Sequence, residues 1–506
     1  MKQTIKVLFA IGLVAGVSGC SSYQQRSQMD AFNVSWVQGD YLGAVEAMEP
    51  KPSLTGKKKA EDKQLLELLH QAEAHRMAGD HTTAIALYDQ AETGMKLDDT
   101  SGLATDLLEG GMAVLVNDAE RDYTPMLAET VLVNTYKGLS FLQQGNRDLA
   151  RIEFNRADDR TRRAVETFAA EIATQRDALE QEKGKQQSQQ RSQQQSIQQS
   201  LASDALQQSV AAHYGEPSQW SVYPEFIVPS ATYLHGLFFL ASGESGDLEK
   251  ATVSLKRVAA MSPGNQALAA DAEMAEALAA GRQSRDTIDH RVWVMYENGL
   301  GPVAKETRFD VPLLLLHGNT TSPAYTGIAL PRYADREPVI EPLQLVDDLG
   351  ARYLPESFSP MGKVVRTEMQ ARFPAVLGRA VASAAIKALM QNAAAEELGA
   401  MGQLGSALFA AATTQADLRS WQAIPDHWEV TSLPRPESGR LTLEGYNGQQ
   451  GDIQLPEWPY TLVYIKRPSQ QGPAQVSLID LEGRHGGEHL SVFGSSNADD
   501  LIADAT

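Results

Sequence analysis

Histidines that lie close to carboxylates are the residues of this sequence that could bind a metal ion. The segment His485-Gly-Gly-Glu-His489 holds two histidines and one glutamate within five residues. A zinc-binding pair of this kind needs the order His-Glu-x-x-His on a helix, so that both rings share one face. Gly486 and Gly487 disfavour a helix. We therefore expect a flexible loop here and no metal site.

Three other histidines, His70, His75 and His81, lie where the apolar spacing is helical. His75 occupies a position at which two helices of a pair would touch, and His81 follows a predicted turn. Packing explains His75 and the turn explains His81, so we expect no metal ligand among the three.

A strand followed by His-Gly is the second feature that could serve catalysis. The run from Val311 to His317-Gly318 resembles the strand and oxyanion turn of an α/β-hydrolase. That fold also needs a G-x-S-x-G nucleophile turn downstream, and none follows Gly318. The alternation of strands and helices typical of that fold is missing as well. A cell-wall or acyl hydrolase stays a remote alternative, and we predict no catalytic residue and no enzyme activity.

The remaining motif classes and the charge narrow the possible functions. The sequence has no Walker loop, no dinucleotide-binding glycine pattern and no cysteine-based metal site, so no cofactor is predicted. Its formal net charge is −20 over 506 residues, with a pI near 5.0. Nucleic acids are bound through cationic surfaces, so we expect no nucleic-acid partner.

The N-terminus predicts export and lipid anchoring. Lys2 and Lys6 precede an apolar run from Val7 to Val17, which is too short to span a bilayer. Val17-Ser-Gly-Cys20 resembles a bacterial lipobox, with Cys20 as the only cysteine of the chain. We predict a signal peptide over residues 1–19, acylation (palmitate included) of Cys20, and no internal disulfide.

The residues after the cysteine suggest which membrane holds the anchor. Ser21 and Ser22 follow Cys20, with no aspartate beside it. This resembles the Gram-negative pattern for the outer membrane, and multiple acyl chains suffice for stable anchoring. We expect the protein to be held at the outer membrane on its periplasmic side. An orientation toward the cell surface stays open.

Residues 20–281 predict an all-α domain built from tetratricopeptide-like helix pairs. The clearest pair lies at 129–157, where small residues (Gly138, Ala150) allow close approach and large ones (Phe141, Phe154) fill the space. A glycine can end one helix in the left-handed conformation, and Asp or Asn can cap the next. Four such dipeptides precede second-helix patterns: Gly39-Asp40, Gly79-Asp80, Gly145-Asn146 and Gly246-Asp247.

The repeat array is irregular. The small residues Ala44, Ala84, Ala150 and Ala251 are separated by 40, 66 and 101 residues, whereas a regular array repeats at about 34. A helical pair around 103–116 could fill the first gap. The second gap holds an extended helix and a Gln-rich insertion at about 160–215. A protruding coiled-coil arm is possible there, but we favour a solvated, partly disordered insertion.

A helical solenoid presents a concave surface to partners. Polar residues on first-helix faces that packing does not require are the candidates for partner binding, and we select Gln71, Asn134 and Lys137 as the predicted groove residues.

Residues 282–467 predict an α+β domain with a helical insert. Short alternating or apolar runs indicate strands before and after a long helical segment at about 364–412. Small residues within 380–412 predict a close-packed helical hairpin rather than a membrane-contacting segment, because charged residues interrupt every long apolar stretch. Residues 468–506, rich in Gly, Ser and Asp, predict a flexible tail.

Several segments together resemble a family of uncharacterised bacterial tetratricopeptide-repeat lipoproteins. The most specific stretches are Glu297-Asn-Gly-Leu-Gly-Pro-Val303 and Ala416-Asp-Leu-Arg-Ser-Trp-Gln-Ala-Ile-Pro425. The weaker ones are the lipobox, Leu132–Leu139, Glu153–Arg156 and Tyr233–Leu237. Members are often encoded near small lipoproteins that look like activators of peptidoglycan synthases, which implies a role in the cell envelope. No catalytic residues are assigned in the family, and the Gln-rich insertion and Gly-rich C-terminus depart from its pattern.

These observations predict a lipid-anchored, non-catalytic scaffold that binds envelope proteins or peptides through its helical groove. The alternative is a structural component of an envelope or export assembly, in which the α+β domain makes the main contacts. The partner and the oligomeric state stay open.

Overall fold

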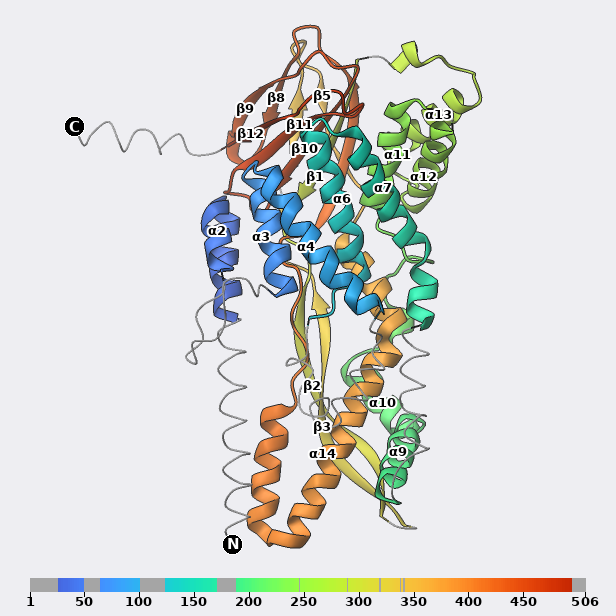
Figure 1. The fold of residues 1–506 in the computed structure, drawn as a ribbon, viewed down its shortest axis with the longest axis vertical. Coiled ribbons are helices and arrows are strands. Elements are labelled where there is room, and N and C mark those ends of the chain that lie inside the picture. Colours follow the sequence, from blue (N-terminus) through green and yellow to red (C-terminus); the bar gives the residue numbers. More distant parts are fainter. Residues whose placement is uncertain are drawn as a thin grey trace, which may run out of the picture.

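The computed structural model describes residues 26–49, 64–100, 123–170, 188–244, 246–288, 290–317, 320–336, 338–339 and 342–493. The molecule is elongated (Figure 1): two β-sheets form one end, helices cover them along the middle, and a two-stranded ribbon with a long helix forms the other end. The predicted layout of a helical N-terminal part and a C-terminal part with sheets is confirmed.

The helices of the N-terminal part follow one another as short antiparallel pairs. Their bounds are 26–38, α2 (Tyr41–Ala47), α3 (Leu65–Met77), α4 (His81–Thr100), α6 (Leu127–Gln143), α7 (Arg147–Arg162), 164–170, α9 (Ser188–Leu201), α10 (Asp204–His213), α11 (Pro229–Ser242), α12 (Asp247–Met261) and α13 (Gln266–Ala279). The helical pair predicted around 103–116 lies outside the described residues.

The predicted glycine turns are present between the helices. Gly79 and Gly145 have φ of +79° and +68°, in the left-handed region. The next side chain then caps the following helix: Asp80 accepts a hydrogen bond from Thr83 N at 3.1 Å, and Asn146 accepts one from Leu149 N at 3.3 Å. These two residues therefore end one helix and start the next.

The fourth predicted turn differs from the others. Gly246 itself is the N-cap of α12. Asp247 instead binds Arg151 of α7, at 2.5 and 2.8 Å, and so joins two helix pairs.

The predicted small residues are needed for close helix packing. A Cβ atom on Gly138 would lie 2.9 Å from the ring of Phe154, and one on Gly236 would lie 2.7 Å from Leu255 Cγ. Both distances are too short for carbon atoms, so a side chain at either position would push its helix pair apart. The pairs α6/α7 and α11/α12 depend on these glycines.

The main sheet has six strands in the order β12-β11-β10-β1-β7-β6. Only the pair β1/β10 is parallel. The bounds are β1 (Arg291–Asn298), β6 (Glu356–Ser357), β7 (His427–Pro434), β10 (Tyr460–Arg467), β11 (Ala474–Asp480) and β12 (Glu488–Val492). The second sheet, in the order β5-β4-β8-β9, has the bounds β4 (Gln344–Val346), β5 (Arg352–Tyr353), β8 (Arg440–Glu444) and β9 (Gln450–Gln454).

The main sheet is buried on both faces, and alternate residues of β1 show this. Val292, Val294 and Tyr296 join the core against the second sheet, whereas Trp293 and Met295 join the core against the helices. The body is therefore a three-layer structure of sheet, sheet and helices, in which side chains alternate between two cores.

The predicted tail over 468–506 is wrong as far as Phe493. β11 is an interior strand of the main sheet and all of its residues are buried. Its polar side chains hide the apolar pattern that would have predicted a strand. In the fold they form hydrogen bonds, and Gln475, for example, donates to Ser491 Oγ at 3.1 Å. Residues 494–506 lie outside the described part of the chain.

The far end of the molecule is an arm, which we define as β2 (Val303–His317), β3 (Thr320–Ala334), α9, α10 and α14 (Met361–Thr413). β2 and β3 pair along 15 residues as an isolated ribbon. Its inner face packs against α14 and the two short helices through Val311, Leu313, Leu315, Ile328 and Leu330. α14 contains Pro374 and folds back on itself (Figure 1), and the 3.3 Å bond from Lys387 Nζ to Thr414 Oγ1 marks the return. The predicted helical hairpin is therefore present.

The predicted disorder of the Gln-rich insertion is wrong for residues 188–201, which form α9. Ser196 and Ser200 lie one helical turn apart and accept hydrogen bonds from Leu316 N and Leu314 N, at 2.9 and 2.8 Å. Ile197 between them enters the core of the arm. The serine hydroxyls satisfy the open edge of β2, which gives this polar sequence a reason to be ordered. In the part of the chain that the structure describes, no helix combines the length and the apolar character needed to cross a membrane.

Candidate functional site

The helical face that carries His70, Tyr88 and Tyr136, called the groove here, is covered by the protein's own chain. Residues 414–425, called the strap here, connect α14 to the main sheet and run against α3, α4 and α6. Trp421 is fully buried, and its indole contacts the rings of Tyr88 and Tyr136 edge-on, with centroids 6.1 and 5.8 Å away. Trp421 therefore belongs to the core between the strap and these helices.

Main-chain hydrogen bonds fix the strap to the helices. Trp421 N donates to Glu129 Oε1 at 2.9 Å, and Gln422 N donates to His70 Nε2 at 3.0 Å. His70 Nδ1 in turn lies 2.8 Å from Leu66 O, to which it donates. Burial lowers the pKa of His70 to about 4. The neutral ring is therefore a structural acceptor for the strap.

Glu129 is a buried carboxylate that joins three parts of the chain. Besides the strap it accepts a hydrogen bond from Met126 N at 2.9 Å and one from the Tyr123 hydroxyl. Burial raises the pKa of Glu129 to about 7, although these hydrogen bonds favour the charged form. The strap is thus attached to a group that titrates near neutral pH.

A buried cluster of four charges attaches the helical layer to the main sheet. Lys466 Nζ of β10 lies 2.6 Å from Glu73 of α3 and 2.6 Å from Glu297 of β1. Arg76 of α3 binds Glu73 at 2.7 Å and approaches Glu297 to 3.6 Å. Lys466 Nζ also donates to Ala423 O of the strap at 2.8 Å. Two cations therefore balance two carboxylates, and the ammonium group joins the strap to both layers.

The electrostatics of this cluster favour the charged state. Burial alone would raise the pKa of Glu73, but the charges of Arg76 and Lys466 outweigh it and lower the pKa to about 2. The hydroxyl of Tyr88 also donates to Glu73, at 2.7 Å. The cluster is a fully paired ionic junction between helices, sheet and strap.

The segment His485–His489 is not the predicted flexible loop. Gly487 N donates to Gln143 O at the end of α6 (2.8 Å), and His489 Nε2 lies 3.0 Å from Met77 O at the end of α3. A Cβ on Gly487 would lie 2.5 Å from the backbone oxygen Leu478 O, so glycine is required for close contact here rather than for flexibility.

The two histidines of this segment interact with different parts of the protein. His485 Nδ1 lies 2.8 Å from Asp480 Oδ2, whereas His489 contacts helix α3. Across the described residues, no group of three or more His, Cys, Asp and Glu side chains could hold a metal ion.

The three predicted partner-binding residues lie inside the helical layer. Lys137 is buried and forms ion pairs with Asp89, Glu92 and Glu153 at 2.7, 2.8 and 3.1 Å. Asn134 donates to Glu153 at 2.6 Å, and Gln71 donates to Glu49 at 3.0 Å. All three are 1% exposed or less. Their side chains are bound within the protein, so none of the three is offered to a partner.

Cys20 and Gly318 lie outside the described residues, and His317 ends β2 with its side chain outside them. The strap itself was visible in the sequence only as the Ala416–Pro425 stretch, because nothing local indicates which surface covers Trp421.

No family model, curated protein or solved structure matches this chain.

Proposed function

We propose that this protein is a non-catalytic scaffold of the bacterial envelope, built from tetratricopeptide-like helix pairs and held at the outer membrane by acylated Cys20. In this proposal it binds other envelope proteins through the arm rather than through the helical groove. The lipobox pattern and the paired helices support the first part. The occupied groove supports the second, because a partner would have to displace Trp421 and its buried hydrogen bonds.

The exposed face of the ribbon carries this proposal. Tyr325 is 78% exposed, and Pro312 lies opposite it on β2. Leu314 and Pro323 form the next pair on the same face, while the other face is packed against α14. An exposed tyrosine among apolar residues is the composition that protein interfaces favour. The ribbon also extends away from the sheets toward the opposite end of the molecule, where it can reach a partner (Figure 1).

Site-specific photo-crosslinking in cells tests this proposal. A photoreactive amino acid replaces Tyr325 in the full-length protein, and matched positions are Val253 on α12 (68% exposed) and Leu349 in a turn of the body (90% exposed). We expect a discrete crosslinked envelope protein from position 325 and none from the other two. Crosslinking from position 253 alone would favour the helix pairs, and no crosslink from any position would contradict the scaffold function.

A structural role in a larger envelope or export assembly is the second candidate, and the same arm favours it, because the ribbon and α14 come from the C-terminal part. Glu368 of α14 accepts hydrogen bonds from Leu127 N and Ala128 N, at 2.6 and 3.0 Å, which ties the arm to α6. If the arm makes the main contacts of an assembly, the Tyr325→Asp variant should dissociate from the large complex. Native gels of solubilised membranes should then show the variant in a smaller species than the parent protein. A complex of unchanged size would count against this role.

A further inference from the structure

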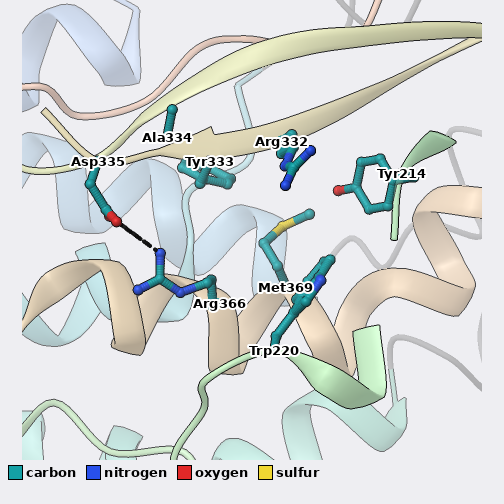
Figure 2. A pocket seen from close by; sticks show the side chains of 8 residues that line it. All are labelled: Tyr214, Trp220, Arg332, Tyr333, Ala334, Asp335, Arg366 and Met369. Carbon is teal, nitrogen blue, oxygen red and sulfur yellow. Dashed lines mark hydrogen bonds and ion pairs between the residues drawn. The ribbon is translucent and has the colours of Figure 1, made fainter. Parts of the chain in front are cut away.

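A pocket lies where the arm joins the body, between the end of β3, the segment after α10 and the start of α14. Its volume is about 400 Å³, which falls within the range of small-molecule sites. Figure 2 shows the lining side chains, which are Tyr214, Trp220, Arg332, Tyr333, Ala334, Asp335, Arg366 and Met369.

The charge of the pocket is positive. Arg332 reaches between the rings of Tyr333 and Tyr214 (Figure 2) and forms no hydrogen bond or ion pair through its side chain with any residue that the structure describes. Arg366 at the other end binds Asp335, at 3.1 and 3.3 Å. Two cations therefore face one carboxylate, in a protein whose net charge is −20. An uncommitted guanidinium in a pocket fits a carboxylate, to which it can donate two parallel hydrogen bonds.

The walls of the pocket are aromatic and apolar. Tyr214 and Met369 are buried, and the ring of Trp220 lies 5.8 Å from that of Tyr214. Trp220 is only partly buried and offers an aromatic surface in the same pocket as the Arg332 guanidinium. A small inorganic anion would leave this ring uncovered, whereas a ligand with an apolar group next to its carboxylate would contact both the ring and the guanidinium.

The pocket is held in shape without a ligand. The Tyr214 hydroxyl donates to Pro331 O at 2.5 Å, and the ring of Tyr214 stacks on Phe373 with centroids 5.2 Å apart. Gln370 of α14 donates to Pro217 O, next to the segment that carries Trp220. A preformed site costs little ordering free energy on binding.

We propose that this pocket binds the terminal carboxylate of a peptide whose last residue is apolar. Arg332 holds the carboxylate in a bidentate pair, and the apolar side chain lies against Trp220 and Met369. The volume accommodates about two residues. The site is separate from the ribbon face at Tyr325, which lies seven residues away along β3, and the inference does not depend on the proposed scaffold function.

Isothermal titration of the full-length protein in detergent tests this site. The probes are N-acetyl-Ala-Phe with a free carboxylate, the same dipeptide as its amide, phenylacetate and inorganic phosphate. We expect the acid to bind at least tenfold more tightly than the amide, because the amide cannot form the charged pair. Phenylacetate should bind more weakly than the dipeptide, and phosphate should not compete.

Variants locate the binding. Arg332→Gln should weaken the dipeptide at least tenfold, and Trp220→Ala should weaken it too. Arg440→Gln is the matched control, since Arg440 is also an exposed arginine on a strand, in the second sheet. Equal affinity for acid and amide would overturn the proposal on the unaltered protein, whether or not a variant folds. Unchanged binding by Arg332→Gln would do the same. Tighter binding of phenylacetate or phosphate would overturn the assignment to a peptide terminus.

Discussion

Replacing Lys466 by Met should uncouple the helical layer from the main sheet. The ammonium group lies 2.6 Å from both Glu73 and Glu297 and donates to Ala423 O of the strap. Methionine keeps most of the volume but removes the charge and three donors. The two carboxylates, each 0% exposed, then face Arg76 alone, so one buried negative charge loses its partner.

Removing one member of a buried ion pair costs about 3–5 kcal/mol of folding free energy, much more than a surface pair contributes. The Lys466→Met variant should therefore unfold at a clearly lower urea concentration than the parent protein, followed by tryptophan fluorescence. Arg162→Met is the control, because Arg162 is 63% exposed and binds Asp158 only at the surface, at 2.9 Å. Its effect should stay within about 1 kcal/mol.

The double variant Lys466→Met, Glu297→Gln separates loss of charge balance from loss of packing. It leaves Glu73 and Arg76 as a balanced pair, so it should recover part of the stability that the single variant loses. A single variant that loses less than about 1 kcal/mol would refute the argument. The argument would also be refuted if the Glu297→Gln change destabilised the Lys466→Met variant as much as it destabilises the parent protein.

The remaining predictions concern acid stability, the strap and the helix pairs. The pKa of Glu73 is lowered from 4.5 to about 2 in the folded protein. The charged Glu73 therefore stabilises the fold above pH 4.5, and this stabilisation is lost as the pH falls from 4.5 through 2. Unfolding measured across this pH range should show the loss, and the Glu73→Gln variant should show a smaller one. The pKa of Glu129 is raised from 4.5 to about 7, so between these pH values the folded state binds one proton more than the unfolded state. The free energy of unfolding should therefore fall as the pH rises from 4.5 through 7, by about 1.4 kcal/mol per pH unit. The Glu129→Gln variant should flatten this slope, and a slope of the opposite sign would contradict the raised pKa. Trp421→Ala should lower the free energy of unfolding by about 3–5 kcal/mol, because it leaves a cavity where the buried indole lies. Urea unfolding measures this, and a loss below about 1 kcal/mol would mean that the strap is not part of the core. Gly138→Leu should lower the thermal unfolding midpoint because even its Cβ would lie 2.9 Å from Phe154, whereas Gly94→Ala, whose Cβ would meet nothing closer than 3.9 Å, should leave it unchanged or raise it.

The helix pairs could be predicted because their signals are local. A glycine at positive φ and an Asx cap lie within three residues of each other, as at Gly79 and Asp80, and the close contact between Gly138 and Phe154 joins neighbouring helices. The strands of the C-terminal part were also visible wherever apolar residues alternate or run together, as in β1 and β10. Local sequence was sufficient for these elements because their conformation is decided within one or two turns of chain.

Local sequence did not predict order in segments whose polar residues or glycines contact partners that are distant in the sequence. Ser196 and Ser200 bind the edge of β2, more than 110 residues away, so a polar helix is ordered by a strand that the sequence does not connect to it. Gly487 lies against Gln143, about 345 residues away in sequence, and its missing side chain makes room for that contact. In both cases composition suggested mobility, whereas the structure uses small or polar residues for close approach and hydrogen bonding.

The strap shows why a groove is hard to assign from its own residues. Packing within a helix pair does not require Gln71, Asn134 or Lys137, yet all three side chains are bound. Asn134 and Lys137 bind carboxylates of adjacent helices, and Gln71 binds Glu49, just after α2. The helical face that carries Tyr88 and Tyr136 is covered by Trp421, whose indole contacts both rings. Because Lys466 binds the strap, the helical layer and the sheet at once, the occupied groove belongs to the core of the protein. A partner that took this groove would have to break the ionic junction as well, so the exposed ribbon of the arm is the surface on which binding costs the fold least.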